Sequence, residues 1–282
     1  MGAGKTEKKS LRNPKSNTKS LRPKIKRTKK KKNNNSKSST IGAINNHGNK
    51  TSRNSETGDV QPASPSHQLS FFLNQFQSAN GVQLSSLELE SIKDTCVVDV
   101  SQDLSQDGSS LGKHMKAAFG SSWKEALCEG QLLEDKIEPG SPAVLVISTS
   151  ALRSIELLRG MRSLTRECRA VKLFSKHMKV DEQVSLLKNR VNIASGTPSR
   201  IKKLIDIEAL GLSRLAVIVL DIYTDVKGYS LLTLPQVRGE FWDLYKNYFH
   251  QRLLQGDLRI CFYGPIPNGN DFEGKRKGAA DE

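Results

Sequence analysis

The sequence predicts an α/β protein built on a single parallel sheet with helices on both faces, and two observations predict it. Short, mostly apolar runs without regular polar alternation read as strands buried on both faces. They lie at 143–147, 170–174, 191–194, 215–220 and 258–262. Between these runs, apolar residues recur at helical spacing, and such alternation of strand and helix favours a parallel sheet.

Helical spacing indicates the other elements. Helices are expected at about 69–81, 111–127, 151 onward, 180–187, 197–210 and 236–254. The segment 84–92 fits either a helix or a short strand, and 96–98 is a possible further strand. Thr197 and Pro198 open one of these helices, because threonine is a good N-cap residue and proline suits the first helical position.

Charge divides the chain unevenly. Residues 1–60 hold 17 Lys or Arg and three acids, a net charge of +14, whereas the whole chain carries +15 and the remainder therefore only +1. The first segment has almost no large apolar residues, so burial cannot offset the conformational entropy that folding would cost. We expect a disordered basic tail at 1–66, one folded domain at 67–266 and a disordered C-terminus at 267–282.

The tail contains the densest run of cations in the chain, which is typical of a nuclear-import signal or a contact with nucleic acid. The residues predicted to contact RNA are Lys24, Lys26, Arg27, Lys29, Lys30, Lys31 and Lys32. A tail that only keeps the protein soluble is the plainer alternative.

Several classes of protein are disfavoured. Cys96, Cys128, Cys168 and Cys261 lack the C-x-x-C spacing of a zinc site and do not suggest a disulfide framework. No apolar run is long enough to span a bilayer, and the first residues lack the apolar core of a secretory signal. Residues 1–6 fit the loose myristoylation pattern, but that pattern is short and frequent by chance. We therefore expect no metal, no membrane and no small-molecule substrate.

Short polar residues follow three of the predicted strands, at 148–150, 195–197 and Asp221. In open parallel sheets, ligands bind beyond the carboxyl ends of the strands. Residues 150–214 carry 14 Lys or Arg and six acids, a net charge of +8, and span two of these strand ends. The alternatives are a surface that faces a polyanion and ordinary solvated helix faces.

Three motifs carry a resemblance to a known family. The stretch 143–153 resembles the Pro-Thr-Arg-Glu-Leu strand and turn of a DEAD-box helicase, 195–200 its T-P-G-R element, and 217–221 the strand bearing its D-E-A-D acids. Residues 173–177, 183–184 and 196–202 resemble the Cms-one ribosomal small-subunit homologue family more closely. That resemblance covers about residues 68–263 and implies a degenerate RecA-like helicase lobe. It also implies a nucleolar role in small-subunit assembly, with pre-ribosomal RNA and small-subunit assembly proteins as partners.

The departures from the helicase pattern concern ATP hydrolysis. The segment 108–114 is one residue short of a phosphate loop and has His114 where Ser or Thr would help to hold magnesium. Ile222 replaces the acid that would position the attacking water. No second lobe, and so no arginine from one, is expected either. We therefore expect no catalytic residue and no cofactor, with a cryptic ATP-dependent RNA helicase kept as an alternative.

Contact with RNA requires fewer specific residues than ATP hydrolysis does. The free amides of a helix N-terminus can hold a phosphate, and an arginine one turn into the helix can pair with it. The residues predicted to contact RNA in the folded domain are Ser148, Thr149, Arg153, Thr197, Pro198 and Arg200. The alternatives are helix caps without a ligand, and a nuclear scaffold for proteins whose basic tail serves import alone.

Overall fold

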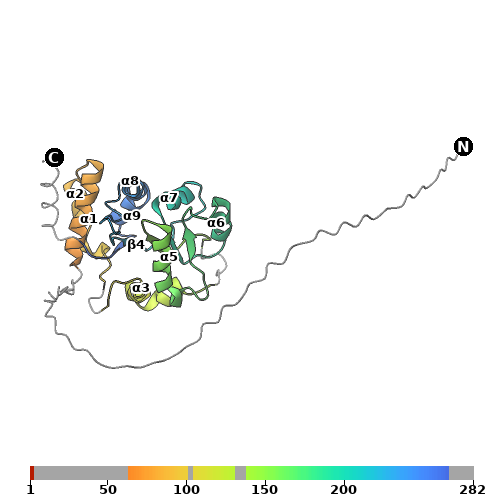
Figure 1. Ribbon diagram of the computed structural model, residues 1–282, viewed down its shortest axis with the longest axis horizontal. Helices are drawn as coiled ribbons and strands as arrows, with labels where there is room; N and C mark the ends of the chain where they lie inside the picture. Colours follow the sequence, from red (N-terminus) through yellow and green to blue (C-terminus); the bar gives the residue numbers. More distant parts are fainter. Residues whose placement is uncertain (3–62, 101–103, 131–137, 267–282) are drawn as a thin grey trace, which may run out of the picture. The chain divides into compact units, whose positions relative to one another are not determined.

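A computed structural model describes residues 1–2, 63–100, 104–130 and 138–266 (Figure 1). From residue 63 onward, the described residues belong to one compact unit that begins at Glu56. The predicted tail cations from Lys24 to Lys32 lie outside the described residues.

The core of this unit is a five-stranded parallel sheet, which confirms the predicted fold class. Its strands are β1 (Val144–Ile147), β2 (Val171–Leu173), β3 (Ile193–Gly196), β4 (Val217–Asp221) and β5 (Arg259–Tyr263). They lie in the order β2-β3-β1-β4-β5. Every residue of β1, β3 and β4 is buried, as the continuous apolar runs predicted.

Helices cover both faces of the sheet (Figure 1). One face packs against α3 (Leu111–Phe119), α4 (Trp123–Leu127) and α5 (Ala151–Gly160). The opposite face packs against α1 (Pro65–Asn80), α6 (Val180–Leu187), α7 (Pro198–Asp206), α8 (Pro235–Leu244) and α9 (His250–Leu254). Side chains along a strand point alternately to opposite faces, so Val144 and Val146 belong to the first core and Leu145 and Ile147 to the second.

The first helix has clear signals at both ends. Ser64 caps α1 by accepting a hydrogen bond from the amide of His67, and proline occupies its first position. Gly81 ends it in the left-handed conformation at φ 62°, which favours glycine. The ambiguous segment that follows is the short helix α2 (Ser86–Ser91), capped reciprocally by Ser85 and Glu88.

Four expectations about individual elements were wrong. The helix expected at 111–127 is broken, because Gly120 lies at φ 55° and a 3-10 turn (Gly120–Ser122) separates α3 from α4. The strand expected at 96–98 is a single parallel bridge between Val97 and Ile260. The helix expected to reach residue 210 ends at Asp206, with Glu208 at positive φ. Helical spacing also predicts that Leu152 shares an apolar face with Ile155 and Leu158, but Leu152 is 72% exposed and does not face the core.

A π-helical segment (Tyr245–Phe249) joins α8 to α9 and explains how so many aromatic residues share one long helix. The wider turn changes the direction in which the following side chains point. Phe241, Trp242, Tyr245 and Phe249 are consequently all buried. Only Tyr248 is partly exposed, where its hydroxyl donates to Asp206.

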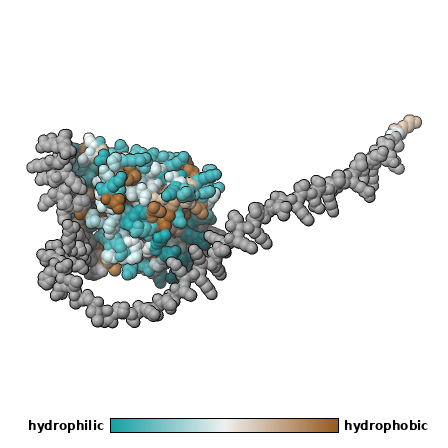
Figure 2. Space-filling model, viewed as in Figure 1, coloured by the Kyte–Doolittle hydropathy of each residue, from teal (hydrophilic) through white to brown (hydrophobic). Residues whose placement is uncertain are grey.

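Apolar residues reach the surface as small, separate groups among hydrophilic ones on the face viewed in Figure 2. Exposed large apolar side chains among the described residues include Leu87, Leu152, Leu186 and Val226. Within the same residues, no helix is both long enough and apolar enough to cross a bilayer.

Replacing Phe72 tests whether α1 is part of the core. Its ring is fully buried, with centroids 5.0 Å from Tyr245, 5.3 Å from Trp242 and 5.5 Å from Phe262. Phe72→Ala should lower the free energy of unfolding by about 3–5 kcal/mol in urea denaturation, because it leaves a cavity. Leu87→Ala, at a position 76% exposed, is the control and should change it by less than about 0.5 kcal/mol. Equal effects of the two changes would contradict this packing.

Candidate functional site

The polar residues predicted at the strand ends lie along one edge of the sheet. Ile147 pairs with Gly196 of β3 and with Leu220 of β4 in the parallel register. The next residue on each strand therefore reaches the same level, which brings Ser148, Thr197 and Asp221 to neighbouring positions. This carboxyl edge is where parallel sheets place their ligands.

At its centre, Arg153 and Asp221 form a bidentate ion pair. Arg153 Nε donates to Asp221 Oδ2 at 2.8 Å and Nη2 donates to Oδ1 at 3.0 Å. Asp221 is only 1% exposed, whereas the Arg153 side chain is 20% exposed. The same guanidinium pairs with Glu156 at 2.9 Å and lies 4.9 Å from the centre of the Tyr223 ring. The guanidinium of Arg153 is thus held by Glu156 from its own helix and by Asp221 and Tyr223 from the end of β4 and the loop after it.

Burial and pairing act in opposite directions on these two charges. Burial raises the pKa of the Asp221 carboxyl above its ordinary value, and the hydrogen bonds from Arg153 oppose that rise. Burial would lower the pKa of the Arg153 guanidinium, but the hydrogen bonds and charge of Asp221 raise it overall. Arg153 therefore stays charged, and its charge is what makes an ionised Asp221 tolerable at this depth.

The serines at the end of β1 are used internally. Ser148 is fully buried, its hydroxyl lies 2.8 Å from that of Ser154, and it also donates to the carbonyl of Ser150. Ser150 caps α5 by accepting from the amide of Arg153 at 3.3 Å. Thr149, by contrast, is partly exposed and lies between these two serines.

At the end of β3, the structure corrects one prediction. Thr197 occupies the N-cap position of α7, but its side chain makes no capping hydrogen bond, although Pro198 does stand at the first helical position. The amide of Thr197 instead donates to the carbonyl of Leu173 and extends the pairing of β3 with β2. Arg200 donates to Gln183 Oε1 at 2.6 Å and to the Met178 carbonyl at 3.2 Å. Like Arg153, it is engaged inside the domain.

The segment that comes nearest to a phosphate loop precedes α3, and its amides already have an acceptor. Asp107 Oδ1 accepts from the amides of Ser109 at 2.8 Å and Ser110 at 3.0 Å. The hydroxyls of Ser105 and Ser109 donate to the same carboxylate. These hydrogen bonds hold the pKa of Asp107 well below its ordinary value. A carboxylate thus occupies the amides at the start of α3, where a helix would otherwise attract a phosphate.

The loop that carries Asp107 is fixed to the sheet and to α5. Tyr223 donates to the carbonyl of Gln106 at 2.9 Å, and Tyr263 donates to the carbonyl of Asp107. Gly108 meets Gly160 of α5 so closely that a Cβ on Gly160 would lie 1.7 Å from the Gly108 carbonyl oxygen. His114 is buried, with Nε2 3.2 Å from the Ser105 carbonyl, and burial lowers its pKa.

Sequence reasoning missed the cations that are exposed at this edge. Lys176 and Lys179 follow β2 on either side of the exposed His177, which lies at φ 61°. Lys227 lies in the exposed turn that follows β4. The sequence could have indicated these lysines, because each of them follows a predicted strand, as Thr197 does. Within the described ranges, no group of three or more His, Cys, Asp or Glu could hold a metal ion.

A parallel sheet with helices on both faces and a polar, partly basic carboxyl edge defines a protein of the α/β class with its candidate site at the strand ends. The sequence profile of the CMS1 family, described as the U3-containing 90S pre-ribosomal complex subunit, matches residues 4–263. The chain belongs to this family, which confirms the resemblance that the motifs indicated.

Curated relatives agree with this assignment. Human Protein CMSS1 is 35% identical over 145 residues, which is 50% of this chain and 49% of the relative. Protein cms1 of Schizosaccharomyces pombe is 31% identical over 131 residues, 45% of this chain and 47% of the relative. The chain thus spans about half the length of these curated relatives.

Solved structures similar to this chain include DEAD-box proteins. One from Methanococcus jannaschii is 16% identical, with a TM-score of 0.34, over 74% of this chain and 51% of that one. Dbp5 L327V of S. cerevisiae, bound to RNA and ADP BeF3, is 14% identical, with a TM-score of 0.37, over 73% of this chain and 47% of that one.

Removing one partner of the central ion pair tests its role. Arg153→Leu should lower the free energy of unfolding at pH 7.5 by about 3–5 kcal/mol, because it leaves a buried carboxylate unpaired. The pKa of Asp221 should then rise further, so the folded state binds a proton more readily than the unfolded state. Stability of the variant should therefore increase as pH falls from 7.5 to 5.

Arg153→Leu combined with Asp221→Asn is the control for this experiment. It removes the charge that lacks a partner, so both the deficit and its pH dependence should shrink. A deficit in the single variant that is the same at both pH values would contradict an ionised, Arg153-dependent Asp221.

Proposed function

We propose that this protein is a non-enzymatic RNA-binding factor of early small-ribosomal-subunit assembly that acts in the nucleolus. Its family description, a subunit of a U3-containing 90S pre-ribosomal complex, supports this stage and this compartment. The partners that follow are pre-ribosomal RNA and small-subunit assembly proteins.

One observation supports the proposal that the protein is not an enzyme: the polar groups at the carboxyl edge already bind one another. Phosphoryl transfer needs free loop amides for phosphate, an acid for magnesium and an acid that positions water. Here Asp107 takes the amides of Ser109 and Ser110, Arg153 takes both oxygens of Asp221, and the next position is Ile222. The same three features are hard to reconcile with the alternative, an ATP-dependent RNA helicase.

RNA contact by the folded domain is supported by the position and charge of its strand ends. Lys176, Lys179 and Lys227 are exposed there, and they are free to follow a phosphate backbone without reading its sequence. The partly exposed Thr149 and Thr197 complete this surface. Pro198, also predicted to contact RNA, is buried and begins α7 instead. Ser148, Arg153 and Arg200 were predicted to contact RNA directly. We now propose that they mainly position the surface, since a phosphate would have to displace their present partners.

The tail supplies the remaining affinity. Seventeen cations in residues 1–60 would release counterions from RNA and give binding that weakens steeply with salt. A second candidate function is a nuclear protein scaffold whose tail serves only import. The internal engagement of Arg153 and Arg200 favours it.

Deletion of residues 1–60 separates these contributions. It should weaken binding to a labelled pre-ribosomal RNA fragment at least about tenfold in fluorescence anisotropy, because most of the net charge is lost. It should also abolish nuclear import, because the dense run of cations is lost. In the full chain, Lys176→Glu with Lys179→Glu should weaken binding by a smaller factor, whereas Lys246→Glu, at an exposed position in the π-helical segment, should not. An unchanged affinity after the deletion would contradict RNA binding by the tail, and unchanged edge variants would favour the scaffold.

Nucleotide binding is tested by thermal shift with ATP and magnesium. We expect no saturable increase in melting temperature up to millimolar nucleotide, because the anion and cation positions are filled by Asp107 and Arg153. ATP-dependent stabilisation that is lost in Lys113→Ala or Asp221→Ala would instead support a helicase or ATPase.

A further inference from the structure

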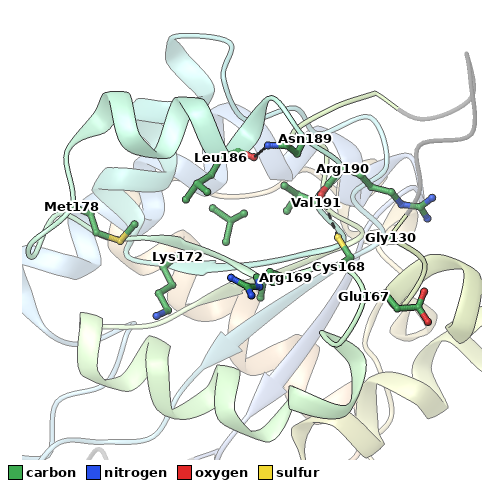
Figure 3. Close-up of a pocket in the computed structure, with 12 residues that line it drawn as sticks. Gly130, Glu167, Cys168, Arg169, Lys172, Met178, Leu186, Asn189, Arg190 and Val191 are labelled. Atoms are coloured by element: carbon green, nitrogen blue, oxygen red, sulfur yellow. Dashed lines mark hydrogen bonds between the residues drawn. The ribbon is translucent and has the colours of Figure 1, made fainter.

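A pocket of about 560 Å³ lies along the outer side of β2. Figure 3 shows the residues that line it, which come from the stretch after α4, the approach to β2 and β2 itself, the loop after β2, α6 and the segment leading to β3. Val171, the first residue of β2, and Val191, which precedes β3, lie toward the amino end of the strands, whereas Met178 follows β2.

The pocket is bounded by the edge of the sheet. β2 is the last strand in the order and pairs with β3 alone among the described residues. On its outer side, Gln183 Nε2 donates to the carbonyls of Lys172 at 2.8 Å and Phe174 at 3.0 Å. This one side chain covers the later part of the edge, and within the described ranges no strand covers the part that begins at Arg169. Such an edge can pair with an extended chain.

Apolar side chains form one wall of the pocket. Leu186 of α6 is 46% exposed, and Met178 is partly buried beside it. The side chains of Val171 and Val191 are buried at the base, at 6% and 1% exposure. Met178 and Leu186 lie on the α6 side of the pocket in Figure 3. An exposed leucine beside an uncovered strand edge offers an anchor for one apolar side chain.

Cations form the opposite side. Arg169 and Lys172 are exposed, and within the described residues neither forms a salt bridge. The carboxylate of Glu167 lies at the far end of the pocket from Lys172 and Met178 (Figure 3). The surrounding segment 159–176 contains six Lys or Arg and one acid. The charge here is therefore complementary to an acidic ligand.

We infer that this pocket binds an extended acidic peptide of a partner protein, which adds to the edge of β2 and places one apolar side chain against Leu186. Main-chain hydrogen bonds along a sheet edge supply affinity in such complexes, and alternate side chains supply specificity. The acidic residues of the peptide would face Arg169 and Lys172. An exposed leucine and a strand edge suit a peptide better than RNA, because an RNA backbone has no apolar group to place against Leu186 and does not pair with a strand. The inference does not depend on RNA binding at the carboxyl edge.

The test uses a random peptide library, so the partner protein need not be identified first. Phage-displayed peptides of about a dozen residues are selected on the full-length protein and counter-selected on full-length Leu186→Asp, which discards peptides that bind the basic tail. Selected peptides should be acidic with an apolar residue. In fluorescence polarisation they should bind Lys172→Glu and Leu186→Asp at least about tenfold more weakly than the unaltered protein. Lys246→Glu makes the same charge change elsewhere and should leave affinity within about twofold.

Three outcomes would overturn the inference. One is that no peptide survives counter-selection, and another is that selected peptides bind the Lys172→Glu protein as tightly as the unaltered one. The third is that Lys172→Glu weakens RNA binding about tenfold while the affinity for the selected peptides stays unchanged, which would assign this cation to RNA. Circular dichroism of each variant confirms that it is folded, and both altered side chains are exposed enough for this to be expected.

Discussion

The carboxylate of Asp221 is almost fully buried at the end of β4, and the guanidinium of Arg153 makes its ionised form tolerable there. A buried charge without a partner would cost several kcal/mol, so this contact constrains both elements that supply it. It joins the start of α5 to the sheet. The remaining contacts of the guanidinium, with Glu156 and the Tyr223 ring, extend the constraint to the loop after β4. The geometry of the carboxyl edge depends on this pair.

Two kinds of group that can bind a nucleotide, free loop amides and an acid, already have partners within the chain at this edge. Asp107 presents a carboxylate to the amides at the start of α3, where a phosphate would be attractive, and Arg153 presents a cation to Asp221. Because Asp107 and Arg153 belong to the chain itself, their charges are always present at this edge. The parallel sheet thus keeps a carboxyl edge whose central polar groups bind one another, while exposed lysines lie beyond the strand ends.

The sheet was predictable because strands buried on both faces leave an unmistakable apolar run, as at Val217–Asp221. Strand-end residues were also placed correctly, since parallel pairing aligns them whatever their chemistry. The side-chain partners were not predictable. Arg153 and Asp221 are 68 positions apart, and no local rule distinguishes an arginine that faces solvent from one that faces a buried acid. The Thr197 side chain that makes no capping bond and the break at Gly120 likewise reflect tertiary contacts and backbone angles that override residue preference.

The contact between Gly108 and Gly160 is made by backbone atoms, with no side chain between the two segments. Side chains can change rotamer to absorb a small displacement, whereas two main chains in van der Waals contact cannot. The loop that carries Asp107 therefore cannot move toward α5 without displacing the helix that carries Arg153. A side chain larger than hydrogen at position 160 would push the two segments apart, and with them the anion and the cation of the carboxyl edge.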